Sequence, residues 1–351
     1  MENANKKILL ILTGGTICSE YHGRVKKQGG AAATELEHSF RESGSPFARL
    51  VDFIPTENLG IFSENMTVEK WNLILNTLRG NPYFMAAAVK SGAYPSLENE
   101  KFKEEDVPDG VIIAHGTDSL SYSAALFSCL FGDLGIPVFL VSSNEALSSD
   151  KSNGRANFRA ATELICRGIP GGVYVTYRNS DKKTYLHRAS RLRRCQNFSE
   201  DFFSDGMTAL LPCGRYDDLP ADYPSEKTDP FGDFTLRGKI AVLHPYPGLD
   251  YGFINLDGVD AVIHGTYHSG TVCSLTDRNA KDFSSSIVSL LEKCGDVPVY
   301  ISPADVGGNI YETVLDVANA KKTGLFFVNS PTEEILYARL LVSLSCGRKG
   351  L

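Results

Sequence analysis

Short apolar runs alternate with amphipathic segments along most of the chain. Residues 8–12 and 111–114 are continuous apolar runs of strand length. Residues 121–130 follow the second run after a short polar turn and predict a helix, and an apolar stripe at helical spacing predicts further helices over 68–79 and 155–167. Buried parallel strands are apolar on both faces and alternate with helices, so we expect an α/β fold with a doubly wound, mostly parallel sheet.

The same pattern continues through the middle of the chain. Residues 137–142 and 173–177 predict two more strands, and the polar turn at 179–183 predicts a β-hairpin that returns the chain. Residues 18–44 are rich in Gly, Ala, Ser and charge and show little periodicity. We expect a mobile loop there that acts as a lid, with a disordered surface excursion as the alternative.

A shift in composition divides the chain into two predicted domains. Residues 215–236 are rich in Asp and Pro and predict a linker between a larger domain at 1–214 and a smaller α/β domain at 237–351. Ser330, Pro331 and Glu333 predict a capping box that begins the last helix. The second domain is expected to alternate strands at 239–243, 261–263, 298–301 and 325–328 with helices near 280–293, 310–321 and 332–345.

Composition and charge exclude several classes of protein. The chain has 351 residues, of which 42% are hydrophobic, and a net charge of -7, which argues against non-specific binding of nucleic acid. No stretch reaches the roughly 20 apolar residues of a membrane span, and the N-terminus lacks a signal-peptide pattern. We expect a cytoplasmic protein with no nucleic-acid or membrane partner.

The cysteines give no sign of a metal site. The eight cysteines are scattered, without a CxxC pair or a histidine at ligand spacing. Cys129 and Cys166 lie on apolar faces of predicted helices, so we expect reduced, packed thiols rather than disulfides or zinc ligands. Neither a metal nor a cofactor is expected.

Two predicted strands end in small polar residues. The first runs into Thr13-Gly14-Gly15-Thr16, and the strand at 111–114 runs into His115-Gly116-Thr117-Asp118. The carboxyl ends of parallel strands commonly carry the ligand, and glycines let the backbone turn sharply there. The residues alone leave Thr16 and Thr117 as either site residues or turn caps. The string His264-Gly265-Thr266 lacks the following Asp, so we interpret it as a packing or interface turn.

The two motifs in this order resemble the paired signatures of the L-asparaginase/glutaminase family, in its type I, cytoplasmic-like form. The resemblance implies that Thr16 is acylated during the reaction. It also implies that Thr117 and Asp118 form a proton relay with an amine, and that Asp118 holds the α-ammonium of the substrate.

A further segment carries the resemblance. Ser63-Glu64-Asn65-Met66, followed by Trp71, is similar to the family segment that receives the substrate carboxylate. The resemblance gives that role to Ser63 and puts Glu64 in the wall of the site. Ser63 or Thr67 as the N-cap of the next helix is the alternative interpretation from the residues alone.

The chain departs from the family pattern at three positions. Arg194 stands where the relay lysine belongs, and a guanidinium does not give up its proton. We therefore expect slow catalysis unless Lys182 or Lys183 substitutes for that lysine. Tyr21 is the candidate for the lid tyrosine that polarises the nucleophile, and Asn144 replaces a glutamine that is usual in the family.

The resemblance implies hydrolysis of L-asparagine to L-aspartate and ammonia by a homodimer or a dimer of dimers. A related amidase with a different amide substrate and a catalytically silent amino-acid-binding protein are the alternatives. The segment around Ser63 and the arginines at 188–194 also resemble the D subunit of the tRNA-dependent glutamine amidotransferase. That protein carries an additional N-terminal domain, whereas this chain begins with the first catalytic strand, so a free amidohydrolase is expected.

Overall fold

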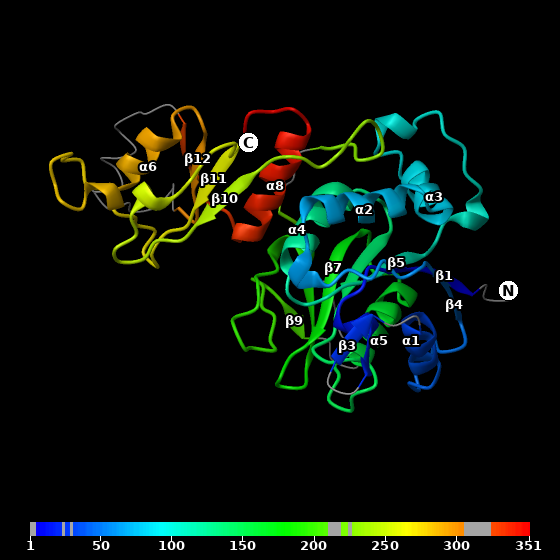
Figure 1. Ribbon diagram of the computed structural model, residues 1–351. Coiled ribbons are helices and arrows are strands. Elements are labelled where there is room, and N and C mark those ends of the chain that lie inside the picture. Colours follow the sequence, from blue (N-terminus) through cyan, green and yellow to red (C-terminus); the bar gives the residue numbers. More distant parts are fainter. Residues whose placement is uncertain (1–4, 23–24, 29–30, 210–218, 224–226, 305–323) are drawn as a thin grey trace. The chain divides into compact units, whose positions relative to one another are not determined.

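The computed structural model describes residues 5–22, 25–28, 31–209, 219–223, 227–304 and 324–351. The chain divides into two compact units, Met1–Leu236 (unit 1) and Arg237–Leu351 (unit 2). Each unit has a parallel sheet with helices packed against it (Figure 1).

Among the described residues, unit 1 contains a seven-stranded sheet with the order β4-β1-β5-β6-β7-β8-β9. The strands from β4 to β7 in that order pair in parallel, and β8 and β9 add antiparallel pairs at one edge. The predicted doubly wound, mostly parallel sheet with a β-hairpin is confirmed. The strands are β1 (Lys6–Leu12), β4 (Val51–Pro55), β5 (Gly110–Ala114), β6 (Pro137–Val141), β7 (Gly172–Arg178), β8 (Thr184–Arg188) and β9 (Thr208–Ala209).

Helices cover both faces of this sheet, so β5 and β6 are buried at every position. Alternate residues of a strand face opposite sides, and Ile8, Leu10 and Leu12 of β1 pack in one cluster with residues of α1 and α5. The other three helices lie on the opposite side of the sheet (Figure 1). The helices are α1 (Ala32–Arg41), α2 (Val68–Arg79), α3 (Pro82–Ser91), α4 (Leu120–Phe131) and α5 (Gly154–Cys166).

The prediction of an irregular loop over residues 18–44 is wrong. This stretch contains the antiparallel pair β2 (Ser19–His22) and β3 (Val25–Gln28), followed by α1. Leu36 and Phe40 of α1 are buried, and the ring of Phe40 packs edge-on against Phe158 of α5 with 6.5 Å between centroids. A few apolar residues four positions apart are enough to anchor a short helix, although the surrounding Gly, Ala and charge hide the period.

Helix α3 was not predicted, although its ends carry recognisable signals. The side chain of Asn81 accepts hydrogen bonds from the N–H groups of Tyr83 and Phe84 at 3.0 and 3.1 Å, and Pro82 occupies the first position. Gly92 ends the helix in the left-handed conformation with φ of 63°. An Asn cap, a proline at the start and a glycine at the end together form a start and stop signal.

Unit 2 contains a four-stranded parallel sheet in sequential order, again among the described residues, with β10 (Ile240–Leu243), β11 (Ala261–His264), β12 (Val299–Ile301) and β13 (Leu325–Phe327). Helix α6 (Ile287–Cys294) packs with the residues of one face, and α8 (Glu333–Ser345) packs with those of the other. The helix expected near 280–293 begins only at Ile287, where the Ser286 side chain caps it. The helix expected near 310–321 lies outside the described residues.

The cap of α8 differs from the predicted one. Thr332 caps the helix by accepting a hydrogen bond from the N–H of Ile335 at 3.1 Å. The Ser330 hydroxyl instead donates to the carbonyl of Thr332 at 2.7 Å. Pro331 therefore lies before the helix rather than at its first position, and the predicted capping box is wrong.

The second half of the predicted linker packs on unit 1. The ring of Phe231 lies 4.7 Å from that of Tyr94 between centroids. Arg79 donates to two backbone carbonyls of this segment, and Leu236 is buried while its N–H and C=O bond the side chain of Asn72 at 2.8 and 2.9 Å. The division into compact units accordingly falls between Leu236 and Arg237.

Candidate active site

The strand order brings the two motif loops to a topological switch point. β1 lies between β4 and β5, so the sheet grows in one direction from β1 to β4 and in the other from β5 onward. Parallel α/β sheets commonly bind their ligands at the carboxyl edge where such a reversal occurs. Residues 13–16 follow β1 and residues 115–118 follow β5, so both motifs lie at this edge.

The two loops touch backbone to backbone. A methyl group on Gly15 would lie 2.3 Å from both the Cα and the N of Gly116, and Gly15 has φ of +78°. Gly14, at φ of +124°, approaches the carbonyl of Ile61 equally closely. Thr13 ties the first loop to β5, because its hydroxyl donates to the carbonyl of Ala114 at 2.8 Å. Only glycine fits both the space and the backbone conformation at positions 14 and 15.

Ser63 and Asp118, 55 residues apart in sequence, form a hydrogen-bonded pair beside this contact. The Ser63 hydroxyl donates to Oδ2 of Asp118 at 2.8 Å and accepts from the Asp118 N–H at 3.3 Å. The Ser119 hydroxyl donates to the carbonyl of Ser63 at 2.8 Å, and a methyl group on Gly116 would lie 2.3 Å from the Ser63 hydroxyl. Thr67 caps α2, so Ser63 does not act as that helix cap.

The remaining predicted residues lie around this joint with different exposure. Thr16, which begins the short 3₁₀ turn Thr16–Cys18, and Thr117 are half-buried, and Asp118 is exposed, so the joint is open to solvent. Glu64 is exposed beside Ser63. Tyr21 lies in β2, where its backbone pairs with Lys26 of β3, and its side chain falls outside the described part of the structure.

His115 supports the second loop from inside. Its Nδ1 lies 2.8 Å from the carbonyl of Gly116, and the Ser142 hydroxyl donates to the carbonyl of His115 at 2.5 Å. Burial lowers the pKa of His115 to about 4, so the ring is neutral near pH 7. The buried Nε2 of this ring has no hydrogen-bond partner in the described part of the chain. We assign His115 to holding the turn rather than to proton transfer.

Trp71, which follows the segment of Ser63, and Ser123, which the sequence analysis did not mark, join the two helices next to the site. Trp71 of α2 donates from its indole N–H to the Ser123 hydroxyl in the first turn of α4 at 2.9 Å. Helix α2 follows Ser63 in sequence and α4 follows Asp118. Trp71 is the only tryptophan of the chain. A large side chain with one polar N–H usually finds a hydrogen-bond partner when it is buried, and this was the signal in the sequence for its supporting role.

Arg194 lies in an exposed segment beyond the short turn Ala189–Arg191, and that turn packs against α4. The preceding residue, Arg193, donates its N–H to the carbonyl of Phe203 at 3.0 Å. Lys182, one of two possible substitutes for the missing lysine, lines a separate cavity whose lining contains none of the predicted catalytic residues. Lys183 is exposed on the same turn.

The string His264-Gly265-Thr266 ends β11 as a packing turn. His264 is buried, and its Nε2 lies 2.6 Å from the hydroxyl of Tyr251. The Thr266 hydroxyl donates to the carbonyl of Pro303 at 3.1 Å. Both polar side chains of the string thus have partners within unit 2.

The described thiols and carboxylates do not form a metal centre. Within the described ranges, no group of three or more His, Cys, Asp or Glu side chains could hold a metal ion. Cys18 is a free, buried thiol beside the first motif, and burial raises its pKa to about 12, which makes it a poor nucleophile. No helix of the described part is long and apolar enough to cross a membrane.

Known proteins resemble this chain over its length. Residues 99–216 match the family model for the N-terminal domain of asparaginase. The chain is 25% identical to the D subunit of glutamyl-tRNA(Gln) amidotransferase from Saccharolobus solfataricus, over 97% of this chain and 71% of that protein. The corresponding protein of Pyrococcus horikoshii is 27% identical over 75% of this chain and 56% of that protein.

Solved structures share the fold. The thermostable L-asparaginase of Thermococcus kodakarensis superposes with a TM-score of 0.66 at 20% identity, covering 97% of this chain and 93% of that chain. L-asparaginase I of Vibrio cholerae has the same TM-score and coverage at 25% identity. The matched family model and the solved structures thus show that this chain is similar to asparaginases over residues 99–216 in sequence and over most of its length in fold.

Proposed function

We propose that this chain is an amidohydrolase that converts L-asparagine to L-aspartate and ammonia through an acyl-enzyme on Thr16. The observation that carries the proposal is the contact of Gly15 with Gly116 at the switch point, beside the hydrogen-bonded pair of Ser63 and Asp118. This contact brings the loops that carry Thr16 and Thr117 to one crevice. Two threonines and a carboxylate at one crevice suit nucleophilic attack on an amide with a proton relay.

The reaction proceeds in two steps. The Thr16 hydroxyl attacks the side-chain amide carbon, its proton passes through Thr117 and Asp118 to the amide nitrogen, and the C–N bond breaks to release ammonia. Water then attacks the resulting ester, which frees the side-chain carboxylic acid of aspartate and restores the Thr16 hydroxyl. Splitting the hydrolysis in this way replaces one difficult step by two easier ones.

The Ser63–Asp118 pair supports an amino-acid amide as the proposed substrate. The α-carboxylate and the α-ammonium of an amino acid share one carbon, so the groups that recognise them must be neighbours. The Ser63 hydroxyl and the Asp118 carboxylate are 2.8 Å apart, which suits a donor for the carboxylate and an acceptor for the ammonium. Sites built for such polar groups reject analogues that lack them by factors of about 10⁴.

This argument predicts that both α-groups of the substrate must be free. N-acylated asparagine and simple aliphatic amides should be turned over at least about a thousandfold more slowly than L-asparagine, measured as kcat/KM by ammonia release. Turnover of N-acylated asparagine at a rate comparable to that of free asparagine would contradict the assignment of Asp118.

We also propose a homodimer or dimer of dimers, a cytoplasmic location, and the lid role of Tyr21, each implied by the family resemblance. Because one face of α1 is buried in the core, the proposed lid consists only of the β2–β3 pair that precedes this helix.

The second candidate is a glutamine-hydrolysing component of an amidotransferase. The similarity to the D subunit of glutamyl-tRNA(Gln) amidotransferase over 97% of the chain favours it. In that case kcat/KM for ammonia release would be higher with L-glutamine than with L-asparagine, and a partner protein would be needed to use the ammonia.

The proposal is tested by ammonia release from L-asparagine by the purified chain. Thr16→Ala should abolish the release, because it removes the nucleophile. Thr266→Ala changes the corresponding string in unit 2 and should leave the rate unchanged. Equal release by wild type and Thr16→Ala would refute the acyl-enzyme. L-aspartate binding without any amide hydrolysis would instead support the catalytically silent amino-acid-binding protein.

A further inference from the structure

A cavity of about 440 Å³ lies over the carboxyl ends of β6 and β7 in unit 1. The loop after β6, at 144–153, forms one wall, and the turn after β7 forms the other. Glu200 closes it from a third segment. The site proposed above lies at the ends of β1 and β5, so this cavity belongs to the next strands along the sheet.

The lining carries equal numbers of positive and negative side chains. None of these six groups forms an ion pair in the described part of the chain, although all face one cavity. Opposite charges that share a cavity without pairing are available to a ligand. The cations are Lys151, Arg178 and Lys182, and the acids are Glu145, Asp150 and Glu200.

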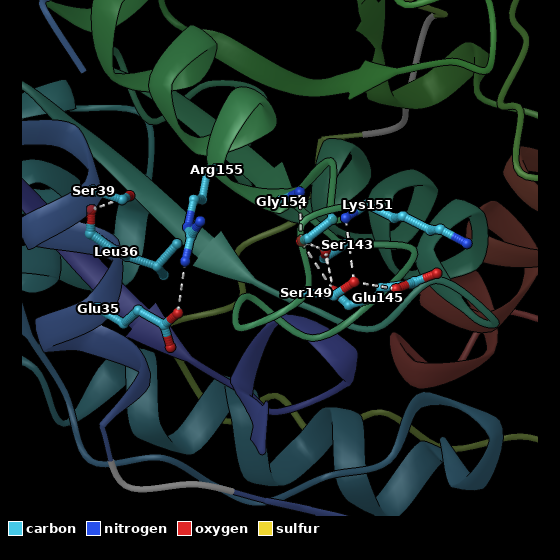
Figure 2. A network of polar contacts seen from close by, with 10 residues as sticks. Glu35, Leu36, Ser39, Ser143, Glu145, Ser149, Lys151, Gly154 and Arg155 are labelled. Atoms are coloured by element: carbon cyan, nitrogen blue, oxygen red, sulfur yellow. Dashed lines mark hydrogen bonds and ion pairs between the residues drawn. The ribbon is translucent and has the colours of Figure 1, made fainter. Parts of the chain in front are cut away.

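Hydrogen bonds hold the two walls in place. The backbone N–H groups of Asn144 and Asn153 each donate to the side-chain oxygen of the other residue, both at 2.9 Å. The side-chain NH2 group of Asn153 donates to the carbonyl of Arg178 at 2.8 Å. Figure 2 shows the network of the first wall, in which the Ser149 hydroxyl donates to the Glu145 carboxylate and accepts from the N–H of Lys151. The two walls are thus held in place before a ligand arrives, which lowers the entropic cost of binding.

The second wall leaves its cations free to bind. Arg178 uses only its Nε, which donates to the carbonyl of Lys182 at 3.1 Å, and its two terminal nitrogens make no hydrogen bond to other described residues. Lys182 has a left-handed backbone with φ of 67°, and non-glycine residues in that conformation cluster at ligand sites. A guanidinium and an ammonium that line the same cavity suit a carboxylate.

The balance of charge decides the class of ligand. A phosphate would face three carboxylates, and a polyamine would face three cations. A zwitterion satisfies both sets at once. We propose that this cavity binds a free α-amino acid, with its carboxylate on Arg178 and Lys182 and its ammonium among Glu145, Asp150 and Glu200. This proposal does not depend on the amidohydrolase activity.

Equilibrium dialysis with radiolabelled L-aspartate tests the proposal in the Asp118→Ala chain, in which an anchor of the other site is absent. We expect one aspartate bound per chain. Adding Lys182→Ala should weaken this binding about tenfold or more, because it removes a charge-assisted hydrogen bond. Lys183→Ala is the matched control, since Lys183 is the next residue of the same exposed turn and does not line the cavity.

A second variant distinguishes a zwitterion from an anion. Asp150→Asn should also weaken aspartate binding, whereas it would strengthen the binding of inorganic phosphate. The absence of aspartate binding in the Asp118→Ala chain, or equal binding in the Lys182→Ala and Lys183→Ala chains, would overturn the proposal. Phosphate binding that rises in Asp150→Asn while aspartate does not bind would do the same. Aspartate binding to the Asp118→Ala chain, together with a wild-type chain that releases no ammonia from L-asparagine, would refute only the proposed function.

Discussion

The string His-Gly-Thr occurs once in each unit, after β5 as His115-Gly116-Thr117 and after β11 as His264-Gly265-Thr266. Both histidines are buried, and each Nδ1 approaches the carbonyl of the next glycine, at 2.8 and 2.6 Å. Burial lowers the pKa of each to about 4. The two strings therefore build the same local turn around a neutral histidine.

The surroundings of the two turns differ. A methyl group on Gly116 would lie 2.3 Å from the Ser63 hydroxyl and 3.1 Å from Gly15, whereas one on Gly265 would find its nearest neighbour, a ring nitrogen of His244, at 3.1 Å. The first turn is followed by the carboxylate of Asp118, and the second by Tyr267. The first thus presents a hydrogen-bonded serine and carboxylate, and the second only packs.

The difference lies in topology. The order β4-β1-β5 reverses the direction in which the sheet grows, and the loops after β1 and β5 meet at this point, where parallel sheets commonly bind ligands in a crevice. The order β10-β11-β12-β13 has no reversal among the described strands, so the loop after β11 lies beside no such crevice. The His-Gly-Thr string forms the same turn in both units. Only the string that follows β5 lies beside a reversal of strand order, and only that string belongs to a candidate site.

The largest expected effect is a difference in kcat/KM between alanine variants of Gly116 and Gly265. Gly116→Ala should lower kcat/KM for asparagine about a hundredfold or more, because the added methyl group displaces Ser63 and the loop of Thr16. Gly265→Ala requires a shift of only a few tenths of an ångström by His244 and should leave kcat/KM within about twofold. Both are measured by ammonia release, with circular dichroism to check folding. Equal losses in the two variants would contradict the contact between the loops.

The next effect concerns Arg194. A lysine can lose its proton when its pKa is lowered, whereas arginine stays protonated, and general acid–base assistance is worth about 10²–10⁴-fold. Arg194→Lys should raise kcat about tenfold or more, and Lys183→Ala should leave it unchanged. A fast wild-type enzyme that loses activity in Arg194→Lys would show that arginine serves the relay in this chain.

The smallest expected effect is on the pH dependence of stability, which we compare between variants of the two buried histidines. Their folded pKa of about 4 lies below the ordinary value of 6.5, so the unfolded chain binds more protons between these limits. Their stabilisation is fully present above pH 6.5 and is lost as the pH falls toward 4. His264→Gln should reduce the fall in Tm between pH 7 and pH 5 by on the order of 5 °C without changing kcat.

His115→Gln should flatten the same pH dependence but also lower kcat, because that ring supports the loop of Asp118. Differential scanning calorimetry at the two pH values, with an activity assay at pH 7, gives both readouts. An unchanged pH dependence in both variants would mean that the buried rings do not titrate in this range.

The strands and both motif loops could be predicted because their signals are local. An apolar run of four or five residues that ends in glycine and threonine is visible in a short window, and residues 8–16 and 111–118 have this form. The pairing of Ser63 with Asp118 has no local signal, since 55 residues separate them, and only the family resemblance suggested it.

The errors also have physical causes. In α1, Leu36 and Phe40 provide only two large apolar residues among Ala, Thr, Ser and charge, so the helix depends on packing against α5 rather than on its own pattern. The segment at 227–236 is polar in composition, yet Phe231 and Leu236 anchor it on unit 1. Ser330 and Thr332 are both acceptable caps, and only the backbone geometry chooses Thr332.

The central claim is that Thr16 carries the acyl group at the β1–β5 joint. The most direct test is mass spectrometry of enzyme quenched in acid during turnover of L-asparagine, followed by peptide mapping. We expect an aspartyl adduct on the peptide that contains Thr16, and its absence in Thr16→Ala. An adduct on any other residue, or ammonia release without an adduct by both the wild type and Thr16→Ala, would contradict the account.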